Sequence, residues 1–353
     1  MQGFYHIITF GCQMNKNDSE HLAGQLEFNG YKQTDKPEAA DILVLNTCSV
    51  RDKAERRVYG QLEYFHHLRQ KNNSAQKIFL SGCMPAYNKE EIKKRLPFLD
   101  GFLSVEEARQ YPPRRENSPE AWVTIMQGCD NFCAYCIVPY VRGRERSRPA
   151  AEILAEINQI DFARHEVLFL LGQNVNSYAG ASTLRQAQRT ELSENISFPE
   201  LLELLLQECP QIPKLAFLTS HPKDLTDELI EVIAKNKKID REIHLPVQSG
   251  NDRILQLMNR GYTLKHYRGL LAKLRARVVD VKPSTDIIVG FPSETEEEFL
   301  DSCRLVEEIG FFRVNTAGFS PRQGTAAASM PSLPQNIIDE RLNRLNALLK
   351  KRG

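Results

Sequence analysis

The sequence contains 353 residues, of which 41% are hydrophobic and 26% are charged, so it can form more than one hydrophobic core. Its formal net charge of +1 excludes a strong overall attraction to nucleic acid or to a membrane surface, and any nucleic-acid site must be a local group of basic residues. The N-terminus has no features of a signal peptide, and no apolar run approaches the roughly 20 residues that cross a bilayer. We therefore expect a cytoplasmic protein.

The first part of the chain alternates short apolar runs with helical patterns. Three runs rich in Ile, Val, Leu and Phe are typical of buried parallel strands: residues 5–10, 41–46 and 77–81. A helical pattern follows each run, and Asp18 or Ser19 is expected to cap the first helix. The alternation predicts an α/β fold, with a doubly wound parallel sheet in an N-terminal domain over residues 1–108. A polar, proline-bearing linker is expected at residues 109–120.

A cysteine follows each of these three predicted strands. The three are Cys12, Cys48 and Cys83. The carboxyl ends of parallel strands lie at one edge of the sheet, where such folds bind ligands, so we expect these cysteines to converge. The alternative is three separately buried thiols, but the recurrence at the same place in three successive units argues against it. Cys209 and Cys303 lie instead in helical apolar patterns and are expected to be buried core residues.

The second part of the chain, residues 121–331, contains six strand candidates separated by helical patterns. They are residues 122–127, 166–174, 214–220, 242–249, 284–292 and 313–320. Six consecutive units of this kind predict a partial (β/α)6 barrel, with its reactive residues at the carboxyl ends of the strands. A polar insertion, residues 181–197, follows the second strand. An amphipathic helix is expected within the last segment, residues 332–353.

A compact cysteine motif follows the first strand of this second domain. The stretch "GCDNFCAYC" places Cys129, Cys133 and Cys136 at C-x3-C-x2-C spacing, and no fourth cysteine or histidine lies nearby. Structural zinc sites, the competing interpretation, usually have four protein ligands in paired units. A [4Fe–4S] cluster held by three thiolates leaves one iron open to a small molecule. Cysteines in a reducing compartment are suited to either role, since they are not expected to form disulfides.

Several stretches of the sequence resemble a known family. The C-x3-C-x2-C spacing with Tyr135 before the last cysteine resembles the motif of radical S-adenosylmethionine enzymes. The stretches "FGCQMNKNDSE", "NTCSVRDKAERRV" and "GCMP" resemble the N-terminal domain of the methylthiotransferases, and "LGQNVNSY" and "HLPVQSGNDRILQLMNRGYT" resemble their radical domain. The resemblance covers nearly the whole chain. It is greatest to the branch that modifies N6-isopentenyladenosine in tRNA.

This resemblance implies two [4Fe–4S] clusters and S-adenosylmethionine as cofactors. The N-terminal trio would bind an auxiliary cluster, and the second trio would bind the cluster that cleaves S-adenosylmethionine. The family's reaction places a methylthio group on C2 of the adenine next to the anticodon. The implied partners are tRNA and an electron donor such as a flavodoxin, whereas the sulfur donor is unknown.

Other candidate site residues lie at the ends of the predicted barrel strands. We expect cofactor binding by Gln173, Asn174, Gln248, Ser249, Gly290 and Arg146. Gly290 also fits a tight turn in "IIVGFPSE", and the arginines at 142, 144, 146 and 148 also fit a solvated loop, with only some of them pointing inward. His221 and His244 are expected to be ordinary hydrogen-bonded histidines.

Three alternatives remain open from the sequence. The same chemistry on threonylcarbamoyladenosine or on an aspartate of a ribosomal protein gives two of them, since no residue identifies the base directly. A protein of another class, a non-catalytic RNA-binding module stabilised by a metal such as zinc, is the third. The family's C-terminal tRNA-binding β-barrel does not follow in this sequence, so weak tRNA binding is also expected.

Overall fold

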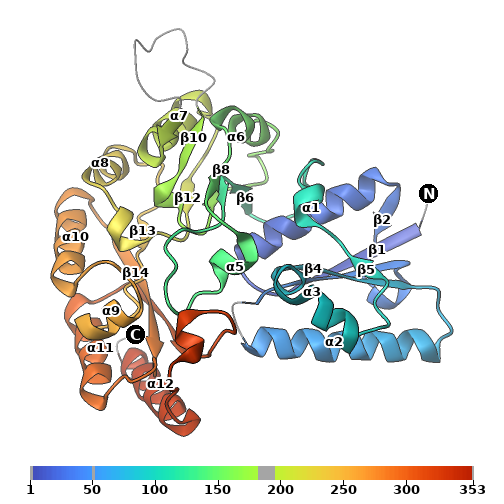
Figure 1. Cartoon of the computed structure of the whole chain (residues 1–353). Coiled ribbons are helices and arrows are strands. Elements are labelled where there is room, and N and C mark those ends of the chain that lie inside the picture. The colour runs from blue at the N-terminus through green and yellow to red at the C-terminus, as the bar shows by residue number, and fades with distance from the viewer. Residues whose placement is uncertain (1–2, 50–51, 182–194, 352–353) are drawn as a thin grey trace. The chain divides into compact units, whose positions relative to one another are not determined.

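The computed structural model describes residues 3–49, 52–181 and 195–351. The chain divides into two compact units, the first of residues 1–118 with 140–142 and the second of residues 119–139 with 143–353 (Figure 1). Both units contain parallel sheets covered by helices, and the α/β fold class is confirmed. None of the helices in the described part of the chain combines the length and the apolar character that a membrane crossing requires.

The first unit contains one sheet of five parallel strands in the order β2-β1-β3-β4-β5. The strands are β1 (Gly3–Thr9), β2 (Tyr31–Gln33), β3 (Ile42–Thr47), β4 (Lys77–Gly82) and β5 (Gly101–Phe102). The three predicted strands form its centre. The edge strands β2 and β5 were not predicted, because three and two residues are too few to produce an apolar period.

Helices cover both faces of this sheet, as its doubly wound topology requires. They are α1 (Gln13–Phe28), η1 (Pro37–Ala39), α2 (Asp52–Lys71), α3 (Cys83–Arg95) and α4 (Val105–Ala108). All six residues of β3 are buried. Leu43 and Leu45 pack with side chains of α2 and α3, and Ile42 and Val44 pack with those of α1. The alternation of side chains along one strand therefore supplies two separate cores.

The first helix begins earlier than the sequence predicted. Cys12 occupies the N-cap position of α1, and Asn15 Oδ1 accepts a hydrogen bond from the Cys12 amide at 3.4 Å. Asp18 and Ser19 are buried inside the helix, so the prediction that either residue caps it was wrong. Because α1 starts directly after β1, its first turn lies at the sheet edge and brings polar side chains there.

The second unit contains six parallel strands. They are β6 (Glu120–Thr124), β9 (Val167–Leu171), β12 (Leu215–Phe217), β13 (Glu242–His244), β14 (Lys282–Val289) and β15 (Arg313–Gly318). They form two sheets, β12-β9-β6 and β13-β14-β15. Leu215 links the sheets, since its amide donates to the Lys238 carbonyl and its carbonyl accepts from the Asp240 amide, both at 2.8 Å. The six strands form the predicted partial (β/α)6 barrel.

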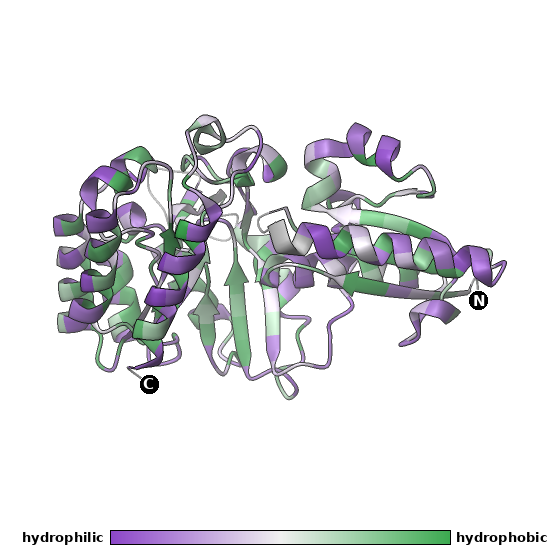
Figure 2. Ribbon diagram, turned by 90° about the horizontal axis from the view of Figure 1, so that it is seen from below, coloured by the Kyte–Doolittle hydropathy of each residue, from purple (hydrophilic) through white to green (hydrophobic). Residues whose placement is uncertain are grey.

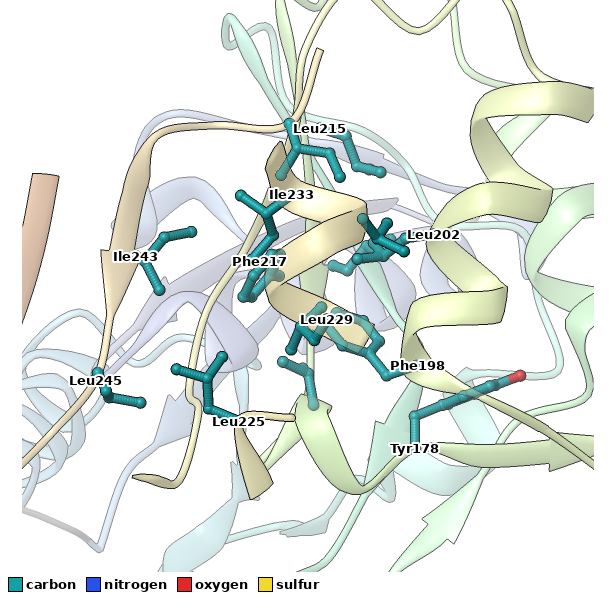
Figure 3. Close-up of a cluster of buried hydrophobic side chains, with 14 of the residues drawn as sticks. Tyr178, Phe198, Leu202, Leu215, Phe217, Leu225, Leu229, Ile233, Ile243 and Leu245 are labelled. Atoms are coloured by element: carbon teal, nitrogen blue, oxygen red, sulfur yellow. The ribbon is translucent and has the colours of Figure 1, made fainter. Parts of the chain in front are cut away.

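Helices pack on the outer surface of these strands. They are α6 (Ala150–Ile157), α7 (Phe198–Glu208), α8 (Asp227–Lys235), α9 (Asp252–Leu257), α10 (Leu264–Arg277), α11 (Glu296–Ile309) and α12 (Gln335–Lys350). Figure 2 shows largely hydrophobic strands and helices with alternating hydrophobic and hydrophilic positions. Figure 3 shows the resulting core. In it the rings of Phe198 and Phe217 pack edge to face, with their centroids 5.1 Å apart.

Short elements connect the barrel units. They are β7 (Met126–Gln127), α5 (Val138–Arg142), β8 (Arg146–Ser147), η2 (Val175–Ser177), β10 (Ala179–Ala181), β11 (Asn195–Ser197), η3 (Pro222–Asp224) and η4 (Ala326–Ser329). The strands β10 and β11 pair antiparallel at the two ends of the predicted polar insertion. Residues 182–194 of that insertion lie outside the described residues.

Candidate metal centres and cofactor site

The first cysteine trio lies at one edge of the five-stranded sheet. Strands β1, β3 and β4 are neighbours, and their last residues are in register, with Thr9 opposite Asn46 and Thr47 opposite Gly82. The cysteines follow these strands within three residues: Cys12, Cys48 and Cys83. The parallel register therefore delivers all three to the same edge.

Close packing brings these cysteines together. Gly11 has φ +125°, and a Cβ at this position would lie 2.6 Å from the Cys48 Cβ, so only glycine allows the loop before Cys12 to approach Cys48. Burial raises the pKa of the Cys83 thiol, the charge of Arg142 opposes this increase, and the charge of Cys12 adds to it. Cys12 and Cys83 therefore lie close enough to interact, and Cys48 lies against the glycine that precedes Cys12.

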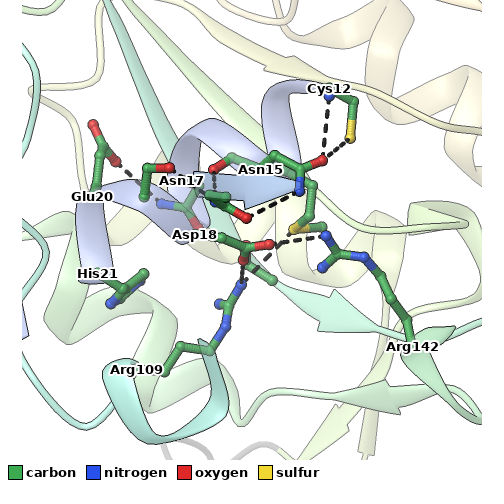
Figure 4. Close-up of polar contacts among 12 residues, drawn as sticks. Cys12, Asn15, Asn17, Asp18, Glu20, His21, Arg109 and Arg142 are labelled. Atoms are coloured by element: carbon green, nitrogen blue, oxygen red, sulfur yellow. Dashed lines mark hydrogen bonds and ion pairs between the residues drawn. The ribbon is translucent and has the colours of Figure 1, made fainter. Parts of the chain in front are cut away.

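Two guanidinium groups accompany this trio (Figure 4). Asp18 is fully buried; its Oδ1 accepts a hydrogen bond from Arg109 at 2.5 Å, and its Oδ2 accepts one from Arg142 at 2.9 Å. Arg142 also hydrogen-bonds Cys83. Two positive charges thus face one carboxylate, and one of them, that of Arg142, also lies beside Cys83. The sequence singled out Arg142 only as one of several loop arginines.

Buried amides fix the start of α1 against the end of β3. The Asn46 side chain donates to the Asn15 carbonyl at 2.7 Å and to Ser19 Oγ at 2.9 Å, and the Asn15 side chain donates to the Thr47 carbonyl at 3.1 Å. Because these bonds join two of the segments that carry cysteines, they hold Cys12 and the end of β3 at a constant separation. Sequence reasoning did not identify either asparagine.

The second cysteine trio lies in the loop after β7, in the second unit. The Cys136 amide donates to the Cys133 carbonyl at 2.9 Å, which forms a tight turn. Burial raises the pKa of the Cys136 thiol to about 12; a bond from the Val138 amide opposes this increase, and the charges of Cys133 and Cys129 add to it. Metal ligation requires thiolates, so a cluster bound here would have to displace the proton of Cys136.

The segment after α9 forms three hydrogen bonds with this cysteine loop. The Asn259 side chain donates to the carbonyls of Asn131 and Phe132 at 3.3 and 3.1 Å, and the Ala134 amide donates to the Met258 carbonyl at 2.9 Å. Phe132 adopts a left-handed conformation with φ +45°, which is uncommon for a bulky residue and needs such support. Residues 258–260 were not singled out from the sequence beyond their place in the resembling stretch.

Unpaired polar atoms lie after the strands β9 and β12. Asn174 is 1% exposed, and its Nδ2 donates a hydrogen bond to Asp224 at 2.7 Å. Its Oδ1 has no hydrogen-bond partner among the described residues, and neither has the Oε1 of Gln173. Asn176 accepts a bond from Ser220 at 3.1 Å, while its Nδ2 is unpaired in the same part of the chain. Buried amide atoms without partners require a ligand or ordered water.

The two histidines differ from each other. His244 is hydrogen-bonded at both ring nitrogens, to Ser284 at 3.0 Å and to Asp286 at 3.2 Å, which confirms the prediction. His221 accepts a bond from the Lys223 amide at 3.3 Å through Nδ1, whereas its Nε2 has no partner among the described residues. Burial, assisted by nearby positive charges, lowers the pKa of His221 to about 2, so the ring stays neutral.

Gln248 and Ser249 follow the fourth barrel strand, as predicted. Gln248 is 8% exposed and has φ +77°, a strained conformation that its backbone bond to the Asp286 carbonyl at 2.9 Å maintains. Ser249 is fully buried, and its Oγ accepts a local bond from the Asn251 amide at 3.3 Å. Gln248 therefore has the greater capacity to contact a ligand.

The two remaining candidates for cofactor binding are Gly290 and Arg146. The Gly290 amide already donates to Glu294 at 2.8 Å, and a Cβ on this glycine would lie 2.6 Å from Ile338. The tight packing of α12 thus accounts for the glycine. Arg146 lies exposed on β8.

The four loop arginines divide into two kinds. Arg142 and Arg148 are the more buried pair, and Arg148 bonds to Glu156 at 2.7 Å. Arg144 and Arg146 are exposed. Only some of the four therefore point inward, as the sequence predicted, and the predicted cofactor ligand Arg146 is one of the outward pair.

Comparisons with known proteins agree with this geometry. The model of the uncharacterized protein family UPF0004 matches residues 4–104, and that of the radical SAM superfamily matches residues 123–306. The tRNA-2-methylthio-N(6)-dimethylallyladenosine synthase of Thermoanaerobacter pseudethanolicus is 41% identical over 99% of this chain and 78% of its own length. The synthase of Dictyoglomus thermophilum is 42% identical over 93% of this chain and 78% of its own length. The chain belongs to the tRNA-2-methylthio-N(6)-dimethylallyladenosine synthase family.

Solved structures support the synthase fold. The radical S-adenosylmethionine methyltransferase TsrM from Kitasatospora setae, with cobalamin and a [4Fe–4S] cluster bound, aligns with a TM-score of 0.65 and 12% identity, over 93% of this chain and 77% of that one. The cobalamin-dependent S-adenosylmethionine radical enzyme OxsB aligns with a TM-score of 0.58 and 11% identity. The alignment covers 99% of this chain and 56% of OxsB. At this identity the likeness concerns the fold alone.

The cofactors of the synthase family are two [4Fe–4S] clusters and S-adenosylmethionine. The donor sets fit these groups, since each unit contains one set of three cysteines that follow strands. No group of three His, Cys, Asp or Glu side chains within residues 3–49, 52–181 and 195–351 has the geometry to hold a metal ion. A cluster makes a different demand from a single ion, because its thiolates bind separate irons.

Proposed function

We propose that this chain adds a methylthio group to C2 of N6-isopentenyladenosine next to the anticodon of tRNA. The proposal depends on one observation: each of the two units has a trio of cysteines that follow its strands, in a chain 41% identical to a synthase of that name. The names of these relatives favour this base over threonylcarbamoyladenosine and over a ribosomal-protein aspartate. The partners would be tRNA and an electron donor of the flavodoxin type, in the cytoplasm.

Each trio has a distinct role in this proposal. Cys12, Cys48 and Cys83 would hold the auxiliary cluster, and Cys129, Cys133 and Cys136 would hold the cluster that binds S-adenosylmethionine. When bound, these groups supply the sulfur and the radical chemistry that substitution at an unactivated C2–H requires. The protein supplies thiolates, buries Cys48, Cys83, Cys129 and Cys133, and keeps each trio in place through the hydrogen bonds described above.

Polar residues at the strand ends would orient the cofactor or the substrate. The unpaired Gln173 Oε1 and Asn174 Oδ1 are acceptors and therefore suit an ammonium or amino group. Gln248 can add a further contact from the fourth strand. Ser249, Gly290 and Arg146 remain predicted cofactor contacts, supported only by their positions in the sequence.

Iron content tests the two sites directly. Anaerobic reconstitution of the wild-type chain should give about eight irons and eight sulfides, because each trio holds a four-iron cluster. Replacing Cys129, Cys133 and Cys136 together by alanine should leave about four. Cys209→Ala serves as the control and should keep about eight, since Cys209 is a buried core residue. A wild-type protein that never exceeds four irons, or that binds zinc without sulfide, contradicts the proposal.

The identity of the substrate base is tested by mass spectrometry of tRNA nucleosides. A host strain without its own synthase accumulates N6-isopentenyladenosine, and expression of this chain should convert it to the 2-methylthio derivative. The Cys133→Ala variant is the matched control and should convert none. Methylthiolation of threonylcarbamoyladenosine instead would assign the chain to the other branch.

A further inference from the structure

Arg260 is a buried guanidinium that contacts the second cysteine trio. It is 4% exposed, and its Nη1 donates to Cys133 Sγ at 3.3 Å. Its Nη2 donates to the Pro246 carbonyl at 2.7 Å, and its Nε donates to the Tyr262 hydroxyl at 3.1 Å. A second contact of Nη1, to the Tyr135 hydroxyl, is longer at 3.5 Å. Every part of the planar group therefore has a defined neighbour.

These neighbours include no carboxylate among the residues that the structure describes. Two other arginines of low exposure differ, since Arg142 pairs with Asp18 at 2.9 Å and Arg341 pairs with Glu294 at 3.0 Å. An uncompensated charge in the interior is strongly unfavourable. No carboxylate therefore compensates the charge of Arg260, and the sulfur beside its guanidinium is that of Cys133.

The thiolate of Cys133 is the candidate for a compensating anion. The other neighbours of the guanidinium, the hydroxyls of Tyr135 and Tyr262 and the Pro246 carbonyl, carry no charge at neutral pH, because a phenol loses its proton only near pH 10. Metal ligation would convert the Cys133 thiol to a thiolate. The charge of Arg260 is then compensated only when the trio holds its cluster.

The distance between Arg260 and this thiolate is held by the adjacent residues. Met258 and Asn259, immediately before Arg260, make three hydrogen bonds to the backbone of the cysteine loop, one through the Met258 carbonyl and two through the Asn259 side chain. The same short segment thus positions the loop and delivers the guanidinium to one sulfur. A solvent-facing arginine would not need this support.

We propose that Arg260 is a positioning residue that raises the reduction potential of the cluster held by Cys129, Cys133 and Cys136. This inference rests on the proposed function. A [4Fe–4S]²⁺ core with three thiolates carries one net negative charge, and one-electron reduction adds a second. A buried cation that also hydrogen-bonds a ligand sulfur stabilises the reduced form more than the oxidised form. Without Arg260, reduction is less favourable.

The test is a redox titration followed by electron paramagnetic resonance, without S-adenosylmethionine. A background chain with Cys12, Cys48 and Cys83 replaced by alanine isolates the second cluster. In this background, Arg260→Met and Arg260→Gln should both shift the midpoint to more negative potential. The shift should be smaller for glutamine, which retains an N–H donor. Because the cofactor is omitted, the shift reports on the cluster and not on cofactor binding.

Controls separate this inference from the proposed function. Arg253→Gln, which removes an exposed ion pair with Glu298 at 2.5 Å, should leave the midpoint unchanged. A background chain that binds no [4Fe–4S] cluster would refute the proposed site itself. A fully loaded Arg260→Met or Arg260→Gln variant with the background midpoint would overturn the inference alone. Loss of the cluster from both variants would also overturn it, by showing that Arg260 is needed for cluster retention.

Discussion

Cys133→Ala is expected to abolish both 5′-deoxyadenosine formation and tRNA methylthiolation, whereas Cys48→Ala is expected to abolish methylthiolation alone. Each substitution removes one thiolate from one trio, and the two trios lie in different units of the chain. Cys133 belongs to the loop braced by Met258 and Asn259, while Cys48 follows β3 beside Gly11. Chromatography of 5′-deoxyadenosine and mass spectrometry of tRNA nucleosides measure the two outcomes in one reaction.

Matched controls exclude a general effect of cysteine loss. Cys209→Ala and Cys303→Ala change thiols that pack with the hydrophobic core of the second unit, and both should retain the two activities. The iron content of each variant, about four for Cys133→Ala and Cys48→Ala, shows that the other cluster is intact. A Cys48→Ala chain that methylthiolates at the wild-type rate would show that the first trio is not the auxiliary site.

The central architecture could be predicted because it depends on local patterns. Short apolar runs followed by helical patterns identify buried parallel strands, and parallel strands place their carboxyl ends at one edge. That topology was enough to predict that Cys12, Cys48 and Cys83, from three separate segments, lie at one edge of the sheet. The start of α1 was missed because Asn15, and not an aspartate or serine, contacts the N-cap residue.

The environment of each trio could not be predicted, because the partners come from distant parts of the sequence. Arg260 lies 127 residues from Cys133, and Arg142 lies 124 residues from Asp18. No periodic pattern relates such positions. Likewise, the contact of Gly290 with Ile338 depends on how α12 packs, and only the three-dimensional structure supplies it.

Asp18→Ala is expected to destabilise the first unit by about 3–5 kcal/mol, because it leaves the guanidinium groups of Arg109 and Arg142 without their carboxylate in a buried place. At about 1.4 kcal/mol for each factor of ten, this corresponds to roughly two to three orders of magnitude in the opening equilibrium. Hydrogen–deuterium exchange of the metal-free chain, followed in peptides of α1 and β3, measures the change. Peptides around Trp122, in the second unit, serve as the internal reference.

The charge, and not the shape, of Asp18 should account for this loss. Asp18→Asn keeps the size of the side chain but removes the negative charge, so it should accelerate exchange nearly as much as Asp18→Ala. Adding Arg142→Gln to Asp18→Asn removes one unpaired guanidinium and should restore part of the protection. Glu90→Ala, which breaks an exposed pair with Lys93 at 3.2 Å in the same unit, should change stability by less than about 1 kcal/mol. If the peptides of Asp18→Asn exchange at the wild-type rate, groups other than Asp18 compensate the charges of Arg109 and Arg142. The prediction is then wrong.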